Sequence, residues 1–237
     1  MATIVLIHGG WHGGWCWKRV LPYLRAAGHE VHAPTLTGMG ERRHLLDREV
    51  NLATHIEDVV ALLDYEDLTD VVLLGHSYGG MVISGVADRV PQRLKRLVFL
   101  DAFAPQNGDS VAGSVPPEQG AAMRKAIDTE GEGWLSPVPP LSVWGVVAPE
   151  DLAWMTPRVG PQPAKTLTDP LRLSNDARLA IPKTYISCVS QQRAAFVAIS
   201  ARIRAEGGWD YRELDAPHDA MVTAPRALAD MLVDVST

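Results

Sequence analysis

Short apolar runs alternate with stretches of helical periodicity over the first hundred residues. The apolar runs are rich in Val, Ile and Leu and lack the alternation that marks a strand with one solvent-exposed face. They predict strands at residues 3–7, 30–33, 71–74 and 94–100, with helices at 17–27, at 54–63 and after residue 79. Buried strands separated by helices are typical of a parallel sheet covered on both faces.

The helix expected at residues 54–63 carries a start signal. Thr54 stands at its beginning, and Glu57 follows three residues later, which is the spacing of a capping box. We therefore expect Thr54 to be the N-cap of this helix.

The alternation stops between about residues 102 and 181. Eleven of the 17 prolines and three of the seven tryptophans fall in this stretch, and its periodicity is weak. A loop of this length inside a compact domain is uncommon unless it acts as a lid or a binding element. Beyond it the pattern resumes, with strands expected at 184–189 and 209–214 and helices at 193–205 and 224–235. The sequence thus predicts an α/β core of residues 1–101 and 182–237, interrupted by an inserted cap of residues 102–181.

The most informative local pattern is Gly75-His76-Ser77-Tyr78-Gly79, which lies between an apolar run and a helical stretch. In a nucleophile elbow, a serine occupies a strained turn between a strand and a helix, and a Cβ in place of either glycine would collide with those elements. The context predicts that Ser77 is a nucleophile. Such a serine requires a base, an acid that orients the base, and an oxyanion hole.

His218 is the expected base. It is the only histidine in the final third of the chain, and it follows the last predicted strand. A lone histidine on a loop is usually only solvated, so the assignment depends on chain order, with the serine first and the histidine last. The remaining histidines have no cysteines or carboxylates clustered around them in the sequence, and we expect no metal site.

Asp101 is the candidate acid, because it directly follows the apolar strand at 94–100. A carboxylate in that position is costly unless it has a partner, and His218 would be that partner. The alternatives are that Asp101 caps a turn or pairs with an arginine. Three other acidic residues, Asp210, Glu213 and Asp215, are too close to His218 in the sequence to be strong rivals.

The oxyanion hole requires two backbone N–H groups. One is expected from Tyr78, the residue after the nucleophile, and the other from Gly10 in the glycine-rich loop after the first strand. The alternative for this loop is the phosphate loop of a dinucleotide-binding unit. Its glycine spacing is wrong for that role, and the second strand does not end in a carboxylate for a ribose.

Composition narrows the range of partners and compartments. The net charge of −6, without a cluster of Lys and Arg, argues against a nucleic-acid partner. Cys16 and Cys188 match no disulfide or metal spacing and are expected to be buried thiols in a reducing compartment. The amino terminus does not resemble a signal peptide, and no stretch approaches the roughly 20 apolar residues that span a membrane. We expect a soluble cytoplasmic protein without a membrane partner, and its oligomeric state stays open, a homodimer included.

Several motifs together resemble those of α/β-hydrolases, and within them the branch of plant methylesterases, hydroxynitrile lyases and small bacterial esterases. The resemblance covers nearly the whole chain and is weakest over residues 102–181. It is carried by HGGWHGGWCW at 8–17, LTGMGER at 36–42, GHSYGG at 75–80 and His218. The resemblance implies the α/β-hydrolase fold, a mostly parallel sheet with helices on both faces, and catalysis without a metal or an organic cofactor.

The chain departs from this branch in two ways. Hydroxynitrile lyases of this branch resemble one another in having a threonine and a lysine where this chain has Gly9 and Asp219. Cyanohydrin cleavage is therefore not expected here. The acid of the branch usually falls where this chain has residues 188–193, which contain no carboxylate. Gln191 could orient an imidazole there but could not offset its charge. With Asp101 as the acid, the chain resembles those α/β-hydrolases in which the acid has moved to the strand after that of the nucleophile.

These features predict a serine carboxylesterase that hydrolyses a small apolar ester, an aromatic one included. Trp11, His12, Trp134, Trp144 and Trp154 are candidates for contact with the substrate, and ordinary core packing is the alternative for the tryptophans. Two other functions fit the same scaffold. One is a lyase or cofactor-free oxygenase in which the histidine and the acid shuttle a proton. The other is a receptor that binds a ligand without turnover.

Overall fold

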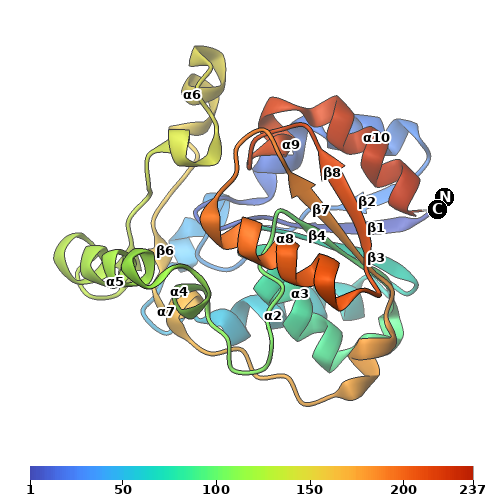
Figure 1. Ribbon diagram of the computed structural model, residues 1–237, viewed down its shortest axis with the longest axis horizontal. Helices are drawn as coiled ribbons and strands as arrows, with labels where there is room; N and C mark the ends of the chain where they lie inside the picture. Colours follow the sequence, from blue (N-terminus) through green and yellow to red (C-terminus); the bar gives the residue numbers. More distant parts are fainter. Residues whose placement is uncertain (237) are drawn as a thin grey trace.

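Six parallel strands form the centre of the computed structural model, which describes residues 1–236 (Figure 1). Their order across the sheet is β2-β1-β3-β4-β7-β8, and each neighbouring pair runs parallel. Their bounds are Thr3–Ile7 (β1), Glu30–His32 (β2), Val71–His76 (β3), Leu94–Leu100 (β4), Lys183–Cys188 (β7) and Asp210–Leu214 (β8). The expected parallel sheet is confirmed, with all six predicted strands in it.

Alternate strand residues enter two separate cores, one on each face of the sheet. Ile4 and Leu6 of β1 pack in the core that also contains residues of α1 and α10, whereas Val5 and Ile7 pack in the core with residues of α2, α3 and α8. These helices span Leu21–Ala26 (α1), Leu52–Tyr65 (α2), Gly79–Arg89 (α3), Ala194–Glu206 (α8) and Pro225–Ser236 (α10). Because both faces are buried, the strands appear in the sequence as continuous apolar runs.

The chain between β4 and β7, residues 102–181, contributes no strand to the central sheet; we call it the β4–β7 segment. In Figure 1 its helices α4 to α7 gather to the left of the sheet. Its elements are α4 (Val111–Ser114), α5 (Pro117–Glu130), β5 (Leu135–Ser136), a 3-10 helix at Leu141–Trp144, α6 (Pro149–Met155), β6 (Gln162–Pro163), α7 (Lys165–Thr168) and a 3-10 helix at Asp176–Ala180. The weak periodicity concealed α5, because this helix buries only Gly120 and Ile127 and so has no continuous apolar stripe.

The helix expected at residues 17–27 is instead two short helices. A 3-10 helix spans Gly14–Arg19, and α1 begins at Leu21 with Pro22 in its first turn. Proline has no N–H to donate, and its fixed φ suits the first turn of a helix, so the chain starts a new helix here. Three further short helices lie outside the β4–β7 segment, at Gly40–Leu45 (3-10), Pro91–Arg93 (3-10) and Ala220–Thr223 (α9).

Helix α2 begins two residues earlier than the sequence predicted. Its N-cap is Asn51, whose side-chain oxygen accepts the N–H of Thr54 at 3.0 Å, while the hydroxyl of Thr54 accepts the N–H of Asn51 at 3.3 Å. The prediction that Thr54 is the N-cap was therefore wrong. Both Thr54–Glu57 and Asn51–Thr54 have the spacing of a capping box, and Asn51 directly precedes Leu52, the first buried residue of the helix.

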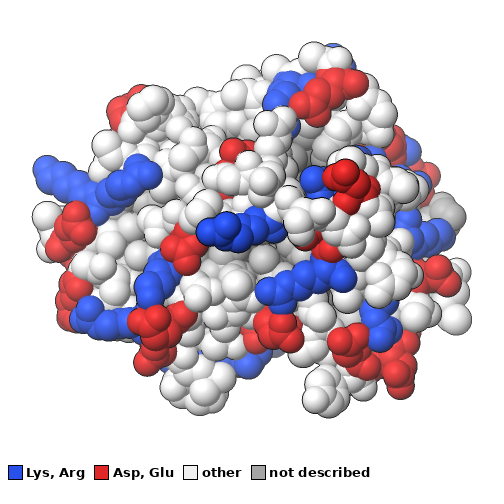
Figure 2. All heavy atoms as spheres, turned by 90° about the horizontal axis from the view of Figure 1, so that it is seen from below, with Lys and Arg blue, Asp and Glu red and all other residues white. Residues whose placement is uncertain are grey.

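The surface carries both signs of charge. Figure 2 shows one face of the molecule, on which basic side chains lie beside acidic ones. Ion pairs on the molecule include Arg93 with Asp64 at 2.7 Å and Lys165 with Glu49 at 2.8 Å. Within residues 1–236, no helix is long and apolar enough to cross a membrane.

The observed N-cap of α2 predicts different contributions of Asn51 and Glu57 to stability. Asn51→Ala removes the side-chain acceptor for the N–H of Thr54 and should lower the free energy of unfolding by about 1 kcal/mol. Glu57→Gln, which would break the capping box first expected, should change it by less than about 0.5 kcal/mol, because Glu57 makes only an exposed ion pair with Arg89. Urea unfolding of the two variants measures both values, and equal losses would contradict the assignment.

Candidate active site

Ser77 lies on a sharp turn between β3 and α3. Its backbone φ is +54°, in the left-handed region that residues with a side chain rarely adopt. A Cβ on Gly75 would lie 2.5 Å from the backbone of Gly79, and a Cβ on Gly79 would lie 2.9 Å from the carbonyl oxygen of Ile7. Both glycines are required because β1, β3 and α3 meet here without room for side chains.

Positive φ angles gather around this turn. Trp11 has a φ of +63° and Asp101 a φ of +40°, and with Ser77 they make up three of the six non-glycine residues with positive φ in residues 1–236. Such strained conformations persist where the surrounding structure enforces them, and they cluster at functional sites.

The side chain of Asp101, just after β4, contacts His218. Its Oδ2 lies 2.6 Å from His218 Nδ1, and its Oδ1 accepts the backbone N–H of Cys188 at 3.3 Å. Asp101 is 2% exposed and His218 1% exposed. Because a carboxylate only accepts hydrogen bonds, Nδ1 of His218 donates to Asp101, and in the tautomer with its single proton on Nδ1 the other nitrogen, Nε2, presents a lone pair. The structure thus brings together two residues that are 117 positions apart in the sequence.

The free nitrogen of His218 is buried. Its Nε2 has no hydrogen-bond partner among residues 1–236. The ring stacks on Phe196 of α8, with centroids 4.9 Å apart and planes at 20°, and His76 lies 4.6 Å away. A buried polar atom without a partner is uncommon and points to a site where a substrate or nucleophile completes the bond.

The other candidates for the acid point elsewhere. Gln191 donates its side-chain N–H to the carbonyl of Ser142 at 3.1 Å. The three acidic rivals have partners of their own: Asp215 accepts from the hydroxyl of Ser190, Asp210 pairs with Arg212 at 2.8 Å, and Glu213 pairs with Arg204 at 3.7 Å.

The loop after β1 is held by Gln162 of β6. The backbone N–H of Trp11 donates to Gln162 Oε1 at 2.8 Å, and Gln162 Nε2 donates to the hydroxyl of Thr166 at 2.7 Å. Gln162 is fully buried, and a Cβ on Gly10 would lie 2.8 Å from its Oε1. No sequence pattern marks Gln162, because its partner is a backbone group 151 residues away.

Tyr78 is fixed by a buried histidine. Its hydroxyl lies 2.9 Å from His55 Nδ1, and His55 Nε2 lies 2.9 Å from the carbonyl of Thr37. Since a carbonyl only accepts, Nε2 carries the proton and Nδ1 accepts the Tyr78 hydroxyl. Burial lowers the pKa of His55 to about 4, so the ring is neutral at ordinary pH.

A cavity of about 400 Å³ opens beside Ser77. Its walls are mostly apolar, with Phe103, Phe196 and Leu167 among them, and Arg193 supplies a cation. Four further residues from the start of the β4–β7 segment were not predicted: Val111, Val115, Gln119 and Met123. Only Gln119 and Met123 share one helix, α5, and their spacing of four residues is the signal that could have found them, since positions four apart lie on one face of a helix.

Of the five residues expected to contact the substrate, Trp11 lines this cavity. The other four are not among the residues that line it, and they make packing contacts. His12 is 1% exposed, and Trp144 packs against its ring at 4.7 Å. Trp154 lies under the guanidinium of Arg19 at 4.6 Å, and Trp134 under that of Arg48 at 5.1 Å. Flat aromatic faces stabilise such cations, so these tryptophans connect the β4–β7 segment to the rest of the molecule.

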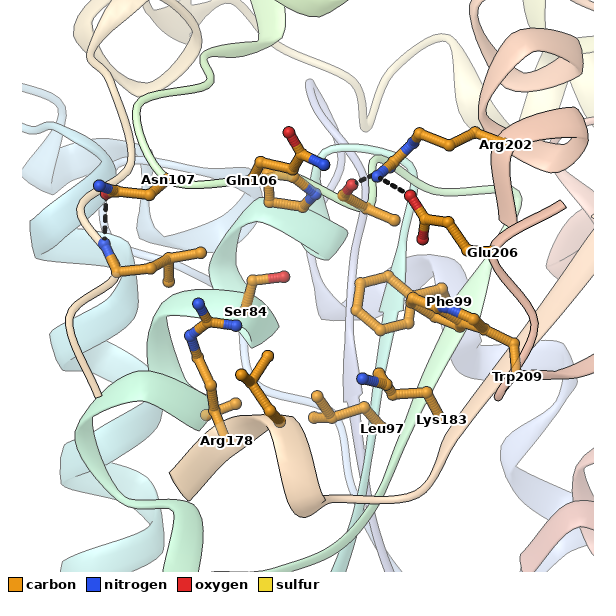
Figure 3. Close-up of a pocket in the computed structure, with 15 residues that line it drawn as sticks. Ser84, Leu97, Phe99, Gln106, Asn107, Arg178, Lys183, Arg202, Glu206 and Trp209 are labelled. Atoms are coloured by element: carbon orange, nitrogen blue, oxygen red, sulfur yellow. Dashed lines mark hydrogen bonds and ion pairs between the residues drawn. The ribbon is translucent and has the colours of Figure 1, made fainter. Parts of the chain in front are cut away.

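A second cavity, of about 260 Å³, is lined by residues of α3, β4 and α8 together with neighbouring loops (Figure 3). Phe99 and Trp209 form an apolar wall, and Arg178 and Lys183 lie across from Arg202. Arg202 is bound to Glu206 at 3.2 Å and to the carbonyl of Ala104. This cavity shares no lining residue with the cavity beside Ser77. Its serine is Ser84, whose hydroxyl donates to the carbonyl of Gly80 at 2.7 Å.

Comparison with known proteins agrees with this geometry. The model of the alpha/beta hydrolase family matches residues 4–231. The chain is 39% identical over 241 residues to a carbendazim hydrolyzing esterase of Nocardioides sp., with 98% of each chain covered. It is 32% identical to methyl jasmonate esterase 1 of Vitis vinifera over 171 residues, which are 70% of this chain and 64% of that protein.

Among solved structures, an extracellular alpha/beta-hydrolase from a Paenibacillus species matches with a TM-score of 0.88 at 29% identity, covering 100% of this chain and 99% of that one. That protein is described as sharing structural and functional homology with tobacco salicylic acid binding protein 2. The resemblance drawn from the motifs, and the expected enzyme class of a hydrolase that acts on ester bonds, are confirmed by these matches.

Three buried histidines make the stability of the protein depend on pH. Burial lowers the pKa of His8 to about 3 and that of His55 to about 4, and it lowers the pKa of His76 well below 6.5. Above pH 6.5 these rings are neutral in the folded and the unfolded chain. Below pH 6.5 these rings bind protons in the unfolded chain but not in the folded chain. The free energy of unfolding should therefore fall by about 1.4 kcal/mol for each ring per unit decrease in pH.

Urea unfolding between about pH 8 and about pH 5 measures this slope. His55→Gln should make it shallower by the contribution of one ring, whereas His44→Gln, at an exposed position, should leave it unchanged. A His55→Gln variant with the full slope of the unmodified protein would show that His55 is not the buried neutral ring described.

Proposed function

The chain belongs to the alpha/beta hydrolase family, and from that premise we propose that it is a serine carboxylesterase that cleaves small apolar esters through an acyl-enzyme intermediate. The observation that carries the mechanism is the contact of 2.6 Å between Asp101 Oδ2 and His218 Nδ1. It fixes a proton on Nδ1 and leaves the buried Nε2 as the base, in a ring that lies 4.6 Å from the ring of His76, the residue before Ser77.

In the proposed reaction, the hydroxyl oxygen of Ser77 attacks the ester carbonyl while His218 Nε2 takes its proton. The negative charge that develops on the carbonyl oxygen is stabilised by the backbone N–H groups of Gly10 and Tyr78. His218 then gives the proton to the leaving alcohol, and an acyl-serine forms. A water molecule, activated by the same Nε2, attacks the acyl group and releases the acid. Asp101 stays ionised throughout and stabilises the imidazolium.

The cavity beside Ser77 supports the choice of substrate. Its volume of about 400 Å³ and its apolar walls suit the acyl part of a small ester, with room for an aromatic ring. The relatives named as esterases include one for methyl jasmonate, which fits a short alcohol as the leaving group. We further propose that residues 102–181 act as a cap, because Val111, Val115 and Met123 close this cavity from outside the sheet.

The lyase alternative is not favoured. A Cβ on Gly9 would lie 2.7 Å from His76 Nδ1 and 3.2 Å from the Cβ of Ser77. The threonine associated with hydroxynitrile lyases therefore has no room at this position. Asp219, in place of the lyase lysine, brings a negative charge where departing cyanide would require a positive one.

We also propose a cytoplasmic location. Cys16 and Cys188 are both buried and free, and burial raises the pKa of each thiol well above its usual value. Protonated thiols in these positions resist oxidation and suit a reducing compartment. When cells of its source are fractionated, the protein should be found in the cytoplasmic fraction. Its recovery outside the cell would contradict the proposal.

Replacement of the nucleophile gives the most direct test. Ser77→Ala should lower kcat for para-nitrophenyl acetate by at least about 10⁴-fold, because no other group forms the acyl intermediate. A fluorophosphonate probe should label the unmodified protein and fail to label this variant. Ser174→Ala, at an exposed serine, is the matched control and should keep both activity and labelling. Activity retained in Ser77→Ala would exclude the mechanism, and ligand binding without turnover in the unmodified protein would favour a receptor.

The role of Asp101 is tested by a change that keeps its shape. Asp101→Asn should lower kcat by about 10⁴-fold with little change in KM, since an amide favours the wrong tautomer of His218 and cannot stabilise its cation. Asp215→Asn is the control, because Asp215 is an exposed carboxylate three residues before His218 that pairs with Ser190. A loss of less than about tenfold in Asp101→Asn would assign the orienting role to another group.

A further inference from the structure

His12 is a buried histidine that the proposed reaction does not use. It is 1% exposed, and both of its ring nitrogens have partners. Nδ1 lies 2.6 Å from the backbone carbonyl oxygen of Gly10, and Nε2 lies 3.1 Å from Asp219 Oδ2. A carbonyl oxygen and an ionised carboxylate only accept hydrogen bonds, so both nitrogens of His12 must donate. The ring that makes both bonds is an imidazolium.

The surroundings of His12 favour the charged ring. Burial alone lowers the pKa of His12, but the charge of Asp219 and the hydrogen bonds to Asp219 and Gly10 raise it above its usual value. The ring of Trp15 stacks on it with centroids 5.5 Å apart and planes at 19°, and Trp144 lies 4.7 Å away. Aromatic faces attract a cation, which adds to the stability of the charged form.

The titratable groups around His12 are consistent with one charge on its ring. Asp219 is fully buried and faces Nε2 directly. His76 meets the ring edge-on at 6.3 Å and is neutral, because its pKa is lowered by burial, by His218 and by His12. His8 is neutral as well, with a pKa lowered to about 3 by burial and, in smaller part, by the charge of His12. Burial and the charge of Asp219 raise the pKa of Cys16, which keeps that thiol protonated.

The pair connects the two loops on which the proposed reaction depends. Gly10 offers one of the two proposed oxyanion donors, and Asp219 directly follows His218. The backbone N–H of Asp219 donates to the carbonyl of Trp144 at 3.1 Å, which fixes its backbone. A buried ion pair with both partners hydrogen-bonded has a defined geometry, and loss of one partner leaves an uncompensated charge.

We propose that His12 and Asp219 form a buried ion pair that positions the N–H of Gly10 relative to His218. The two are positioning residues for the proposed ester hydrolysis, and this inference rests on that proposed function. It also gives Asp219 a role: the carboxylate that stands where hydroxynitrile lyases have a lysine is the counter-charge of His12.

The ionisation state is tested by NMR of labelled imidazole nitrogens in the unmodified protein. Both nitrogens of His12 should carry protons at neutral pH, and the ring should lose one only above its ordinary pKa of 6.5. A His12 ring with one unprotonated nitrogen at neutral pH would overturn the proposal. This measurement requires no ester hydrolysis, so it decides the ion pair even if Ser77 proves not to be a nucleophile.

The positioning role is tested by Asp219→Asn, with Asp215→Asn as the matched control. The amide keeps the shape of the side chain but removes its charge, so His12 should become neutral, and kcat for para-nitrophenyl acetate should fall by about 10- to 100-fold. KM should change by less than about threefold, because neither residue lines the cavity. An unchanged kcat in a variant whose His12 is neutral would show that the pair does not position the site.

A charge-retaining variant separates positioning from simple packing. Asp219→Glu should keep a protonated His12 and recover more of kcat than Asp219→Asn, although Glu is the larger change in shape. If packing alone mattered, Asp219→Asn would keep a higher kcat than Asp219→Glu. Thermal unfolding checks that each variant is folded, and if neither is, the NMR measurement on the unmodified protein still decides whether the ion pair exists.

Discussion

The backbone at Ser77 holds a φ of +54° because β1, β3 and α3 come together with no Cβ between them. The turn is tied to the next strand as well. The N–H of Ser77 donates to the carbonyl of Leu100 at 3.2 Å, and its own carbonyl accepts the N–H of Phe103 at 3.1 Å. These bonds flank Asp101, so the proposed nucleophile and the proposed acid lie on one rigid frame. Packing at the end of the sheet, rather than local preference, maintains the strain.

Around this turn, buried polar groups are arranged so that each charge has a partner. Asp101 faces His218 and Asp219 faces His12, and all four residues are at most 2% exposed. An unpaired carboxylate in such a place would be strongly destabilising. The neighbouring rings of His8, His55 and His76 stay neutral because burial lowers their pKa values. The region thus combines the His12–Asp219 ion pair, a carboxylate that accepts the Nδ1 proton of His218, and three neutral rings, and His218 Nε2 has no hydrogen-bond partner within residues 1–236.

The β4–β7 segment does more than close the cavity. Gln162 binds the N–H of Trp11 in the first loop, and the carbonyl of Trp144 binds the N–H of Asp219 beside His218. Residues of one inserted segment therefore support both loops that carry the proposed oxyanion donor and the base. Substrate access and the geometry of the proposed site therefore depend on the same stretch of chain.

The sequence by itself determined the sheet and the elbow at Ser77, because each leaves a local mark, and it named Asp101 among several candidates for the partner of His218; the structure shows the contact between the two. Buried strands require continuous apolar runs, the turn requires Gly75 and Gly79, and a carboxylate after an apolar strand requires a partner. The start of α2 was misplaced because two overlapping pairs had the same capping spacing. Only the tertiary structure decided the roles of Gln162, His12 and Asp219. Their bonds join groups 151 and 207 residues apart, and two of these bonds end on backbone atoms, which carry no side-chain signature in the sequence.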